Sequence, residues 1–359
     1  ARDLPCPRLL GDMTVAEVRP DASGALPTRQ MVFFVRHAES RWNRAQKEWA
    51  PFALFSENDH GLSDTGRLQA ESLRARVLAA KKVQEAEPEG TPVPESIESP
   101  WLASLLHPDV VFSSPFTRAL ETAFIGLSDL LPDSPVAPNG RIVVMREARE
   151  QKNFGGADST GVATGEEIRG RVEEELRYLY TAAGQLDTLD TSKEHWPDRV
   201  AEEFRKVDLD VSGVQDEWWG NLTGDSEGDL EERVHALAAR LRETQGSLDG
   251  RVGGGGSSIV VGHSLFIKTV FRTFLRDSVE SSPVPLAPAS LRSQILPYCG
   301  VVGARFEWDE KTGQCHIAEV IPLLGTQLSP PDASGEMTKS VVGGCTCGRA
   351  SVDPNCVIA

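Results

Sequence analysis

An arginine–histidine pair follows the first apolar run of the sequence. Arg36 and His37 come directly after M-V-F-F-V (31–35). Imidazole is largely neutral near pH 7, so one ring nitrogen of His37 can attack a phosphorus atom while a hydrogen bond holds the other. The planar guanidinium of Arg36 matches the geometry of phosphate oxygens. The pair therefore suits transfer of a phosphoryl group to a histidine.

Groups that suit the same reaction follow three further apolar runs. They are Arg118 after V-V-F (110–112), Glu147 after R-I-V-V-M (141–145) and His263 after S-I-V-V (258–261). Arg118 offers a second guanidinium fork, and a cationic His263 would donate to the same oxygens. Asn43 adds a neutral donor one turn beyond the nucleophile. Glu147 could serve as the acid and base for the leaving group if its pKa is raised.

The four apolar runs predict buried strands, and three of them continue into helical patterns. This alternation favours an α/β fold of three layers, α/β/α, with a mostly parallel central sheet. Ligands bind such sheets beyond the carboxyl ends of the strands, where all four polar clusters fall. The long segment 150–257, with acidic helical patterns at 166–180 and 227–243, predicts a cap of helices and loops beside the site.

The remaining stretches predict the domain boundaries. Residues 1–30 form an N-terminal extension, residues 31–325 the catalytic domain and residues 326–359 a flexible tail. Residues 81–100 hold charge, proline and glycine and are expected to form a surface loop. The glycine run at 253–256 lacks the Lys-Ser or Lys-Thr that follows a phosphate-binding loop, so it predicts only a flexible lead into a strand.

Composition excludes several classes of protein. With 37 basic and 53 acidic residues among 359, the net charge is −16, which argues against a nucleic-acid partner. No apolar run reaches 18 residues, and no signal-peptide pattern opens the chain. The six cysteines have neither disulfide-scaffold nor zinc-site spacing. We therefore expect a cytoplasmic protein. No metal or other cofactor is expected, because arginines supply the positive charge that metals supply elsewhere.

Four motifs in this sequence resemble those of the histidine phosphatase superfamily, which includes the cofactor-dependent phosphoglycerate mutases. They are F-V-R-H-A-E-S-R-W-N (34–43), D-H-G-L-S-D-T-G-R-L-Q-A (59–70), S-S-P-F-T-R-A-L-E-T-A (113–123) and V-V-G-H-S (260–264). The resemblance covers about residues 31–325, with the motifs in the order and at the spacing typical of the family.

The resemblance implies a role for each matching residue. His37 would be the phosphorylated histidine, and Arg36, Arg118 and His263 would form the phosphate pocket with assistance from Asn43. A small phosphorylated molecule would be the substrate.

Two acidic residues compete for the role of the acid. Glu147 in M-R-E is the better match to the acid of the family, and Glu150, three residues later, is the weaker candidate.

Departures from the mutase pattern favour a phosphomonoester hydrolase, a phosphatase, over a mutase. Residues 48–58 replace the F-x-G-W-type segment of the mutases, and residues 148–161 are more similar to the acid loop of eukaryotic phosphatases. The alternative is phosphoglycerate mutase-type transfer through the same intermediate.

A serine hydrolase with Ser264 as nucleophile is disfavoured, because Phe266 replaces the small residue that such a turn requires. A catalytically inactive scaffold is also disfavoured, because no motif residue is lost. The segment D-E-W-W-G-N (216–221) would help to select the substrate.

The last four residues, C-V-I-A, fit the pattern for prenylation. Cys356 would carry the prenyl group, and the final alanine favours farnesyl. One prenyl chain gives only weak membrane association, so a second signal is needed, and Cys345 and Cys347 could supply it as palmitate sites. The alternative is an unmodified tail whose last residues carry no signal.

Overall fold

The computed structural model describes most of the chain between residues 28 and 328. The described residues are 28–50, 52, 57–86, 99–132, 140–152, 157–186, 196–220, 224–246, 256–276, 288–309 and 311–328. The predicted N-terminal extension up to residue 27, most of the predicted tail with Cys356, and residues 253–255 of the glycine run lie outside them.

A seven-stranded sheet forms the centre of the fold. Its strands are β1 (Thr28–Arg36), β2 (Val110–Ser113), β3 (Arg141–Val144), β4 (Asp208–Asp210), β5 (Ser257–Gly262), β6 (Val301–Trp308) and β7 (Cys315–Leu323). They lie in the order β4-β3-β2-β5-β1-β6-β7. The first five in this order are parallel, while β6 is antiparallel to both β1 and β7. All four predicted strands are present, and the structure adds β4, β6 and β7.

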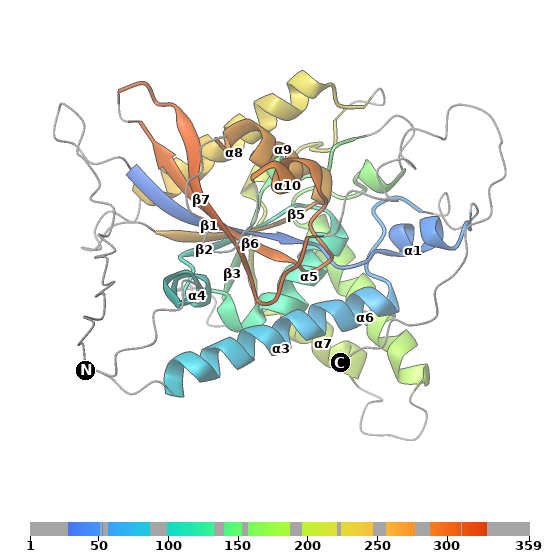
Figure 1. Cartoon of the computed structure of the whole chain (residues 1–359). Coiled ribbons are helices and arrows are strands. Elements are labelled where there is room, and N and C mark those ends of the chain that lie inside the picture. Colours follow the sequence, from blue (N-terminus) through green and yellow to red (C-terminus); the bar gives the residue numbers. More distant parts are fainter. Residues whose placement is uncertain are drawn as a thin grey trace, which may run out of the picture.

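Helices cover both faces of the sheet. They are α1 (Arg41–Lys47), α3 (Asp64–Ala86), α4 (Ser99–Leu106), α5 (Thr117–Leu127), α6 (Glu167–Leu186), α7 (Trp196–Arg205), α8 (Glu227–Gly246), α9 (Ser264–Phe274) and α10 (Pro288–Ser293). Single 3-10 turns occur at Ser128–Leu130, Arg146–Ala148, Ala157–Ser159 and Ser212–Val214. Figure 1 shows α8, α9 and α10 on one side of the sheet and α3 and α7 on the other. The predicted three-layer α/β/α fold with a mostly parallel sheet is confirmed.

Alternation along β1 explains why both faces are covered. Side chains of successive strand residues point to opposite faces of a sheet. Phe33 and Val35 accordingly join the core under α3 to α7, whereas Val32 and Phe34 join the core under α8 to α10. All four are fully buried. A strand that is apolar at every position therefore requires a helical layer on each side.

The helical layers bury one stripe each. In α9 the buried residues are Phe266, Ile267, Val270, Phe271 and Phe274, a spacing of three and four that lies on one side of a helix. Within the predicted cap region 150–257, α6 packs on α7 while α8 packs on α9, and Asp208–Asp210 adds the edge strand β4. This segment therefore contributes to the sheet and to the helical layers.

The strand order brings four carboxyl ends together. Strands β3, β2, β5 and β1 are neighbours and parallel, so the segments after Val144, Ser113, Gly262 and Arg36 emerge along one edge. Backbone hydrogen bonds continue beyond the strands, from His37 N to the Gly262 carbonyl (2.9 Å) and from Ser114 N to the Val261 carbonyl (2.9 Å). Tertiary structure thus places the predicted groups at a common edge.

None of the helices in the described ranges is long and apolar enough to cross a membrane.

Candidate active site

His37 lies at the end of β1 with one ring nitrogen already engaged. Its Nδ1 is 2.6 Å from the Ala38 carbonyl oxygen, which can only accept a hydrogen bond. Nδ1 therefore carries the proton, and the lone pair of Nε2 is left for attack. The ring is only 3% exposed. Burial, with the charges of Arg118 and Arg36, lowers the pKa of His37 well below its ordinary value, which keeps the imidazole neutral.

Three cationic or donor groups surround His37. The His263 ring lies with its centroid 4.9 Å from that of His37, and its Nε2 is 2.8 Å from the Ser114 hydroxyl. Arg36 directly precedes His37 and donates from Nη1 to the Leu296 carbonyl at 2.8 Å. Arg118 acts on both histidines, because its charge lowers the pKa of each. The structure therefore brings Arg36, Arg118 and His263, three of the four residues predicted to bind phosphate, together beside His37.

Several donor nitrogens of this cluster are buried without a hydrogen-bond partner among the described residues. They are Arg36 Nε, Arg118 Nε, Arg118 Nη2 and His263 Nδ1, whose protonation decides whether it donates. A buried donor left unsatisfied costs about 1–3 kcal/mol, so such groups are rare in folded proteins. Phosphoryl oxygens are strong acceptors that would satisfy these donors, with additional gain from the charge of the arginines. The cluster thus fits a phosphoryl group beside His37.

The second sequence motif positions Arg118 from outside its own helix. Asp59 accepts hydrogen bonds from Thr117 N (2.9 Å) and from the Thr117 hydroxyl (2.7 Å) at the start of α5. The N-cap residue Phe116 offers no side-chain cap, so a carboxylate from another segment satisfies a free N–H of the first turn. Arg118, the next residue, is fully buried and bonds the Asp158 carbonyl through Nη1 at 3.1 Å.

The two candidate acids have different environments. The Glu147 side chain is 27% exposed, and its Oε1 lies 3.9 Å from Nε of the exposed Arg146. Glu150 lies next to the pocket, because both Arg118 and Arg36 act on its carboxyl. Burial raises the pKa of Glu150 above its ordinary value despite the hydrogen bond from Gln151 N and the two arginines. A carboxyl with a raised pKa near two arginines is suited to act as a general acid.

Asn43 has a local role in addition to its predicted one. Its side-chain oxygen accepts hydrogen bonds from Ser40 N at 3.2 Å and from the Ser40 hydroxyl at 2.9 Å. Ser40 in turn accepts from Asn43 N, which completes a capping box at the start of α1. The contact of Asn43 with phosphate stays a prediction.

Tyr298 is a site residue that the sequence analysis missed. The guanidinium of Arg36 lies over its ring, with the carbon 4.0 Å from the ring centroid, and the His37 ring centroid is 6.2 Å away. The turn that carries it is hydrogen-bonded to Arg36 on both sides, from Cys299 N to the Arg36 carbonyl and from Arg36 N to the Gly300 carbonyl. No sequence motif indicates this contact, because more than 250 residues separate Arg36 from Tyr298.

The W-W segment of the predicted cap packs behind the pocket. Trp218 is buried, meets Phe116 edge to face with ring centroids 4.8 Å apart, and donates from Nε1 to the Ala163 carbonyl at 2.9 Å. Phe116 in turn contacts the His263 ring, with centroids 5.4 Å apart. In the structure, Trp218 thus supports the aromatic wall behind the histidines.

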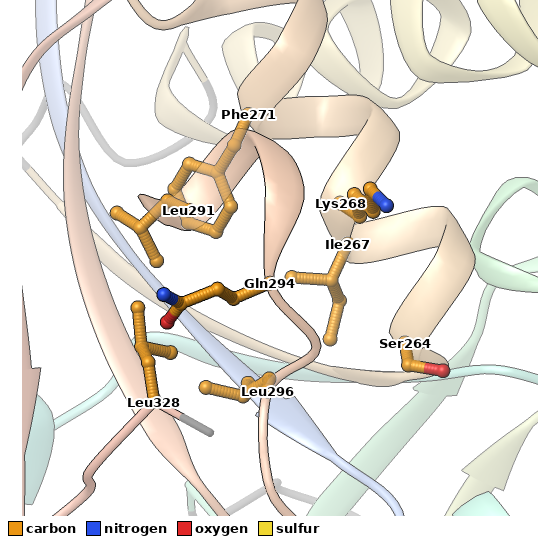
Figure 2. A pocket seen from close by; sticks show the side chains of 8 residues that line it. All are labelled: Ser264, Ile267, Lys268, Phe271, Leu291, Gln294, Leu296 and Leu328. Atoms are coloured by element: carbon orange, nitrogen blue, oxygen red, sulfur yellow. The ribbon is translucent and has the colours of Figure 1, made fainter. Parts of the chain in front are cut away.

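A small hollow lies beside Leu296, whose carbonyl accepts the hydrogen bond from Arg36 (Figure 2). It is lined by Ser264, Ile267, Lys268, Phe271, Leu291, Gln294, Leu296 and Leu328. Its lining is mainly apolar, and Figure 2 shows Ser264 at its edge. Ser264 is the residue that a serine hydrolase would use, and it faces this edge at the start of α9.

No group of three or more His, Cys, Asp or Glu side chains that could hold a metal ion occurs within the described residues.

A buried carboxylate links the second motif to α5. Glu121 accepts a hydrogen bond from Leu62 N through Oε2 at 2.7 Å, and its Oε1 has no partner among the described residues. Burial raises the pKa of Glu121 to about 8, and the neighbouring Glu175 charge adds to the effect. Because the native state binds this proton more tightly than the unfolded chain, stability is lost as pH rises from the ordinary pKa to about 8.

Glu121→Gln is therefore expected to gain stability relative to the native protein as pH rises from 5 to 8. Glutamine keeps the acceptor for Leu62 N but has no proton to lose. Thermal unfolding of both proteins across this pH range is the measurement. Glu232→Gln, at an exposed site on α8, is the control. A melting-temperature difference that does not change with pH would contradict the role of Glu121.

Comparisons with known proteins give matches in structure alone. A scan against protein-family models and a search of curated proteins found no match. Among solved structures, the chain is similar to an ecdysone phosphate phosphatase from Bombix mori (15% identity, TM-score 0.41, 90% of this chain and 98% of that chain). It is also similar to a mycobacterial glucosyl-3-phosphoglycerate phosphatase (14%, 0.39, 80% and 97%) and a phosphoglycerate mutase from Bacillus anthracis (17%, 0.36, 81% and 92%). These proteins belong to the histidine phosphatase and phosphoglycerate mutase group that the four sequence motifs resemble, and the scores are too low to carry an argument about activity.

Proposed function

We propose that this chain is a histidine phosphatase that hydrolyses phosphomonoesters through a phosphohistidine on His37. The observation that carries the proposal is a neutral, oriented imidazole among buried donors without partners. Arg36 and Arg118 would bind the phosphoryl oxygens, and their fixed charges would stabilise the charge of the transition state. His263 would donate to the same oxygens once the bound phosphate raises its pKa from its lowered value.

The reaction has two steps that balance. In the first, His37 Nε2 forms a bond to phosphorus, the phosphorus–oxygen bond to the leaving alcohol breaks, and Glu150 gives that oxygen its proton. In the second, water attacks phosphorus, Glu150 takes a proton from the water, and the bond to Nε2 breaks. Inorganic phosphate leaves and both side chains return to their starting states.

The assignment of the acid to Glu150 rather than Glu147 rests on environment. The charges of Arg36 and Arg118 act on the Glu150 carboxyl, whose pKa is raised, whereas the partly exposed Glu147 side chain lies beside Arg146. The sequence preference for Glu147 came from the better match of M-R-E to the acid of the family that the motifs resemble. Glu147 lies within the 3-10 turn Arg146–Ala148, whereas Glu150 follows that turn and meets different surroundings.

Release of phosphate from small phosphomonoesters, undiminished by excess EDTA, is the expected result for the purified chain. Sugar phosphates, phosphoglycerates, inositol phosphates and phosphopeptides form the panel of substrates. Arginines supply the positive charge, so chelation should not lower the rate. The mutase alternative predicts transfer between hydroxyl groups that depends on 2,3-bisphosphoglycerate. No release from any substrate, or full inhibition by EDTA, would overturn the proposal.

A further inference from the structure

The loop that carries Glu150 is tied on both sides of that residue to one carboxylate. Asp225 Oδ1 accepts from Arg149 Nη2 at 2.7 Å, and Oδ2 accepts from Arg149 Nη1 at 2.8 Å. The same Oδ2 accepts from Lys152 N at 2.8 Å, and Asp225 N donates to the Lys152 carbonyl at 2.9 Å. The residues before and after the pair Glu150–Gln151 are therefore fixed to a single point.

A second arginine closes the arrangement from α8. Arg233 donates from Nη2 to Asp225 Oδ2 at 3.1 Å and from Nη1 to the Arg149 carbonyl at 2.8 Å. Arg149 is thus held through its side chain by Asp225 and through its backbone by Arg233. We call these four residues, Arg149, Lys152, Asp225 and Arg233, the Asp225 clamp.

The clamp has the geometry of a strong interaction. The Arg149–Asp225 pair is bidentate, and the three charged side chains of Arg149, Asp225 and Arg233 are only 7–13% exposed. Charge-assisted bidentate bonds fix geometry more tightly than neutral ones, and shielding from solvent reduces screening. Removing one partner of such a pair leaves an uncompensated charge. The loop is therefore held in one position.

The clamp also extends to the predicted cap segment. Lys152 Nζ donates to the Gly220 carbonyl at 3.0 Å, next to the W-W pair. Gly220 has a φ of +76°, and a Cβ there would lie 3.2 Å from Arg149 Nη2. A side chain at this position would press on the guanidinium that binds Asp225. Glycine at position 220 thus leaves room for the Arg149 guanidinium beside the loop that carries Glu150.

The clamp is electrostatically connected to the site. The charge of Arg233 favours ionisation of Asp225 and acts on His263, and the charge of Glu150 acts in turn on Arg233. Burial and the neighbouring Arg149 lower the pKa of Arg233 to about 10, so it remains cationic at neutral pH. Of the clamp residues, Arg233 therefore interacts electrostatically with both Glu150 and His263.

We propose that the Asp225 clamp positions Glu150 for proton transfer to the leaving group, so that Asp225 and Arg233 are positioning residues of the reaction. This inference rests on the proposed function. Displacement of a catalytic group by about 1 Å can lower the rate about 100-fold. The hydrogen bonds from Asp225 and Arg233 that hold this short loop therefore matter for catalysis.

Asp225→Asn is the test, measured on an alkyl phosphate and on p-nitrophenyl phosphate. The alkyl leaving group needs the proton, and nitrophenolate does not. We expect the rate on the alkyl ester to fall about 10–100-fold and the rate on the nitrophenyl ester to fall about threefold or less. Because a loosened loop exposes Glu150, its raised pKa should fall, and the basic limb of the pH profile should move to lower pH.

Two further variants keep the test decisive. In a Glu150→Gln background, Asp225→Asn should cause no additional change in the ratio of the two rates, because the acid is already absent. If Asp225→Asn does not fold, Arg233→Met removes only the bonds from α8 and should shift the ratio in the same direction. Asp129→Asn, which breaks a surface pair with Arg74, is the control for general loss of an ion pair.

The outcomes separate the inference from the proposed function. If the native protein hydrolyses both esters but Asp225→Asn loses both rates equally, the clamp has a structural role only and the inference is wrong. If the ratio changes as much in the Glu150→Gln background as in the native one, the clamp does not act through Glu150. If the native protein hydrolyses neither ester, the proposed function fails and the inference falls with it.

Discussion

Replacing His37 with alanine is expected to abolish phosphate release, by about 10⁴-fold or more, as expected when a covalent catalyst loses its nucleophile. His37 is the ring whose Nδ1 is fixed to the Ala38 carbonyl and whose Nε2 is left for attack among Arg36, Arg118 and His263. Alanine has no group that can form the intermediate, and nearby water lacks the orientation that the ring has.

The intermediate itself gives the direct measurement for His37. Brief exposure of the native protein to a substrate labelled in its phosphoryl group should leave a label that is labile to acid and stable to base, as expected of phosphohistidine. His37→Ala should acquire none. His235→Ala, an exposed histidine on α8, should label like the native protein. A label of the same stability on His37→Ala would place the nucleophile elsewhere.

Replacing Glu150 with glutamine is expected to slow hydrolysis of alkyl phosphates by about 10²–10⁴-fold. Glutamine keeps the shape of the side chain and can still accept from Gln151 N, but it has no proton to give. p-Nitrophenyl phosphate should lose much less, because its leaving group departs without protonation. Steady-state rates on the two substrates are the measurement.

Glu147→Gln is the matched control, because it changes the same residue type three residues earlier, at a partly exposed position beside Arg146. It should leave both rates nearly unchanged. If Glu147→Gln instead shows the large loss on alkyl esters alone, the acid is Glu147 and the assignment to Glu150 is wrong. Equal losses on both esters in Glu150→Gln would indicate a structural role for that residue.

The pH dependence of phosphate release follows from the ionisation of Glu150 and His37. Glu150 must be protonated to donate, so kcat/KM should fall as pH rises through its raised pKa. His37 must be neutral, and its lowered pKa means that it stays so well below pH 6.5. Activity should therefore decrease as pH rises through the raised pKa of Glu150. The second ionisation of the substrate, near pH 6, affects the native protein and Glu150→Gln equally. A decrease of kcat/KM at high pH that the native protein shows and Glu150→Gln lacks is therefore due to Glu150.

The sequence alone determined the parallel core and the positions of most candidate site residues. Runs such as M-V-F-F-V are apolar at every position, and a strand of this kind is stable only when both faces of the sheet are covered. In β1, alternate side chains indeed enter two different hydrophobic cores. The polar residue that follows each run must then lie at the carboxyl edge. For this reason His37, Arg118 and His263 could be placed together before any contact was known.

The antiparallel half of the sheet depended on tertiary pairing. β6 pairs with β1, where Val35 is opposite Val301, and β7 pairs with β6. β4 is only three residues long and pairs with β3 at the other edge. Partners this distant in the chain, or strands this short, leave no local pattern that identifies the pairing. The contact of Tyr298 with Arg36 depends on the same long-range pairing.

The choice between the two acids was also made by tertiary structure. Glu147 and Glu150 are three residues apart after the same strand, and residue type and spacing cannot separate them. Their difference arises from what surrounds each carboxyl: Arg146 at the surface for Glu147, and the two pocket arginines for Glu150. Asp225, 75 residues further along the chain, fixes the loop on both sides of Glu150. A pKa depends on burial and on neighbouring charges, and both are properties of the folded chain rather than of the sequence near the residue.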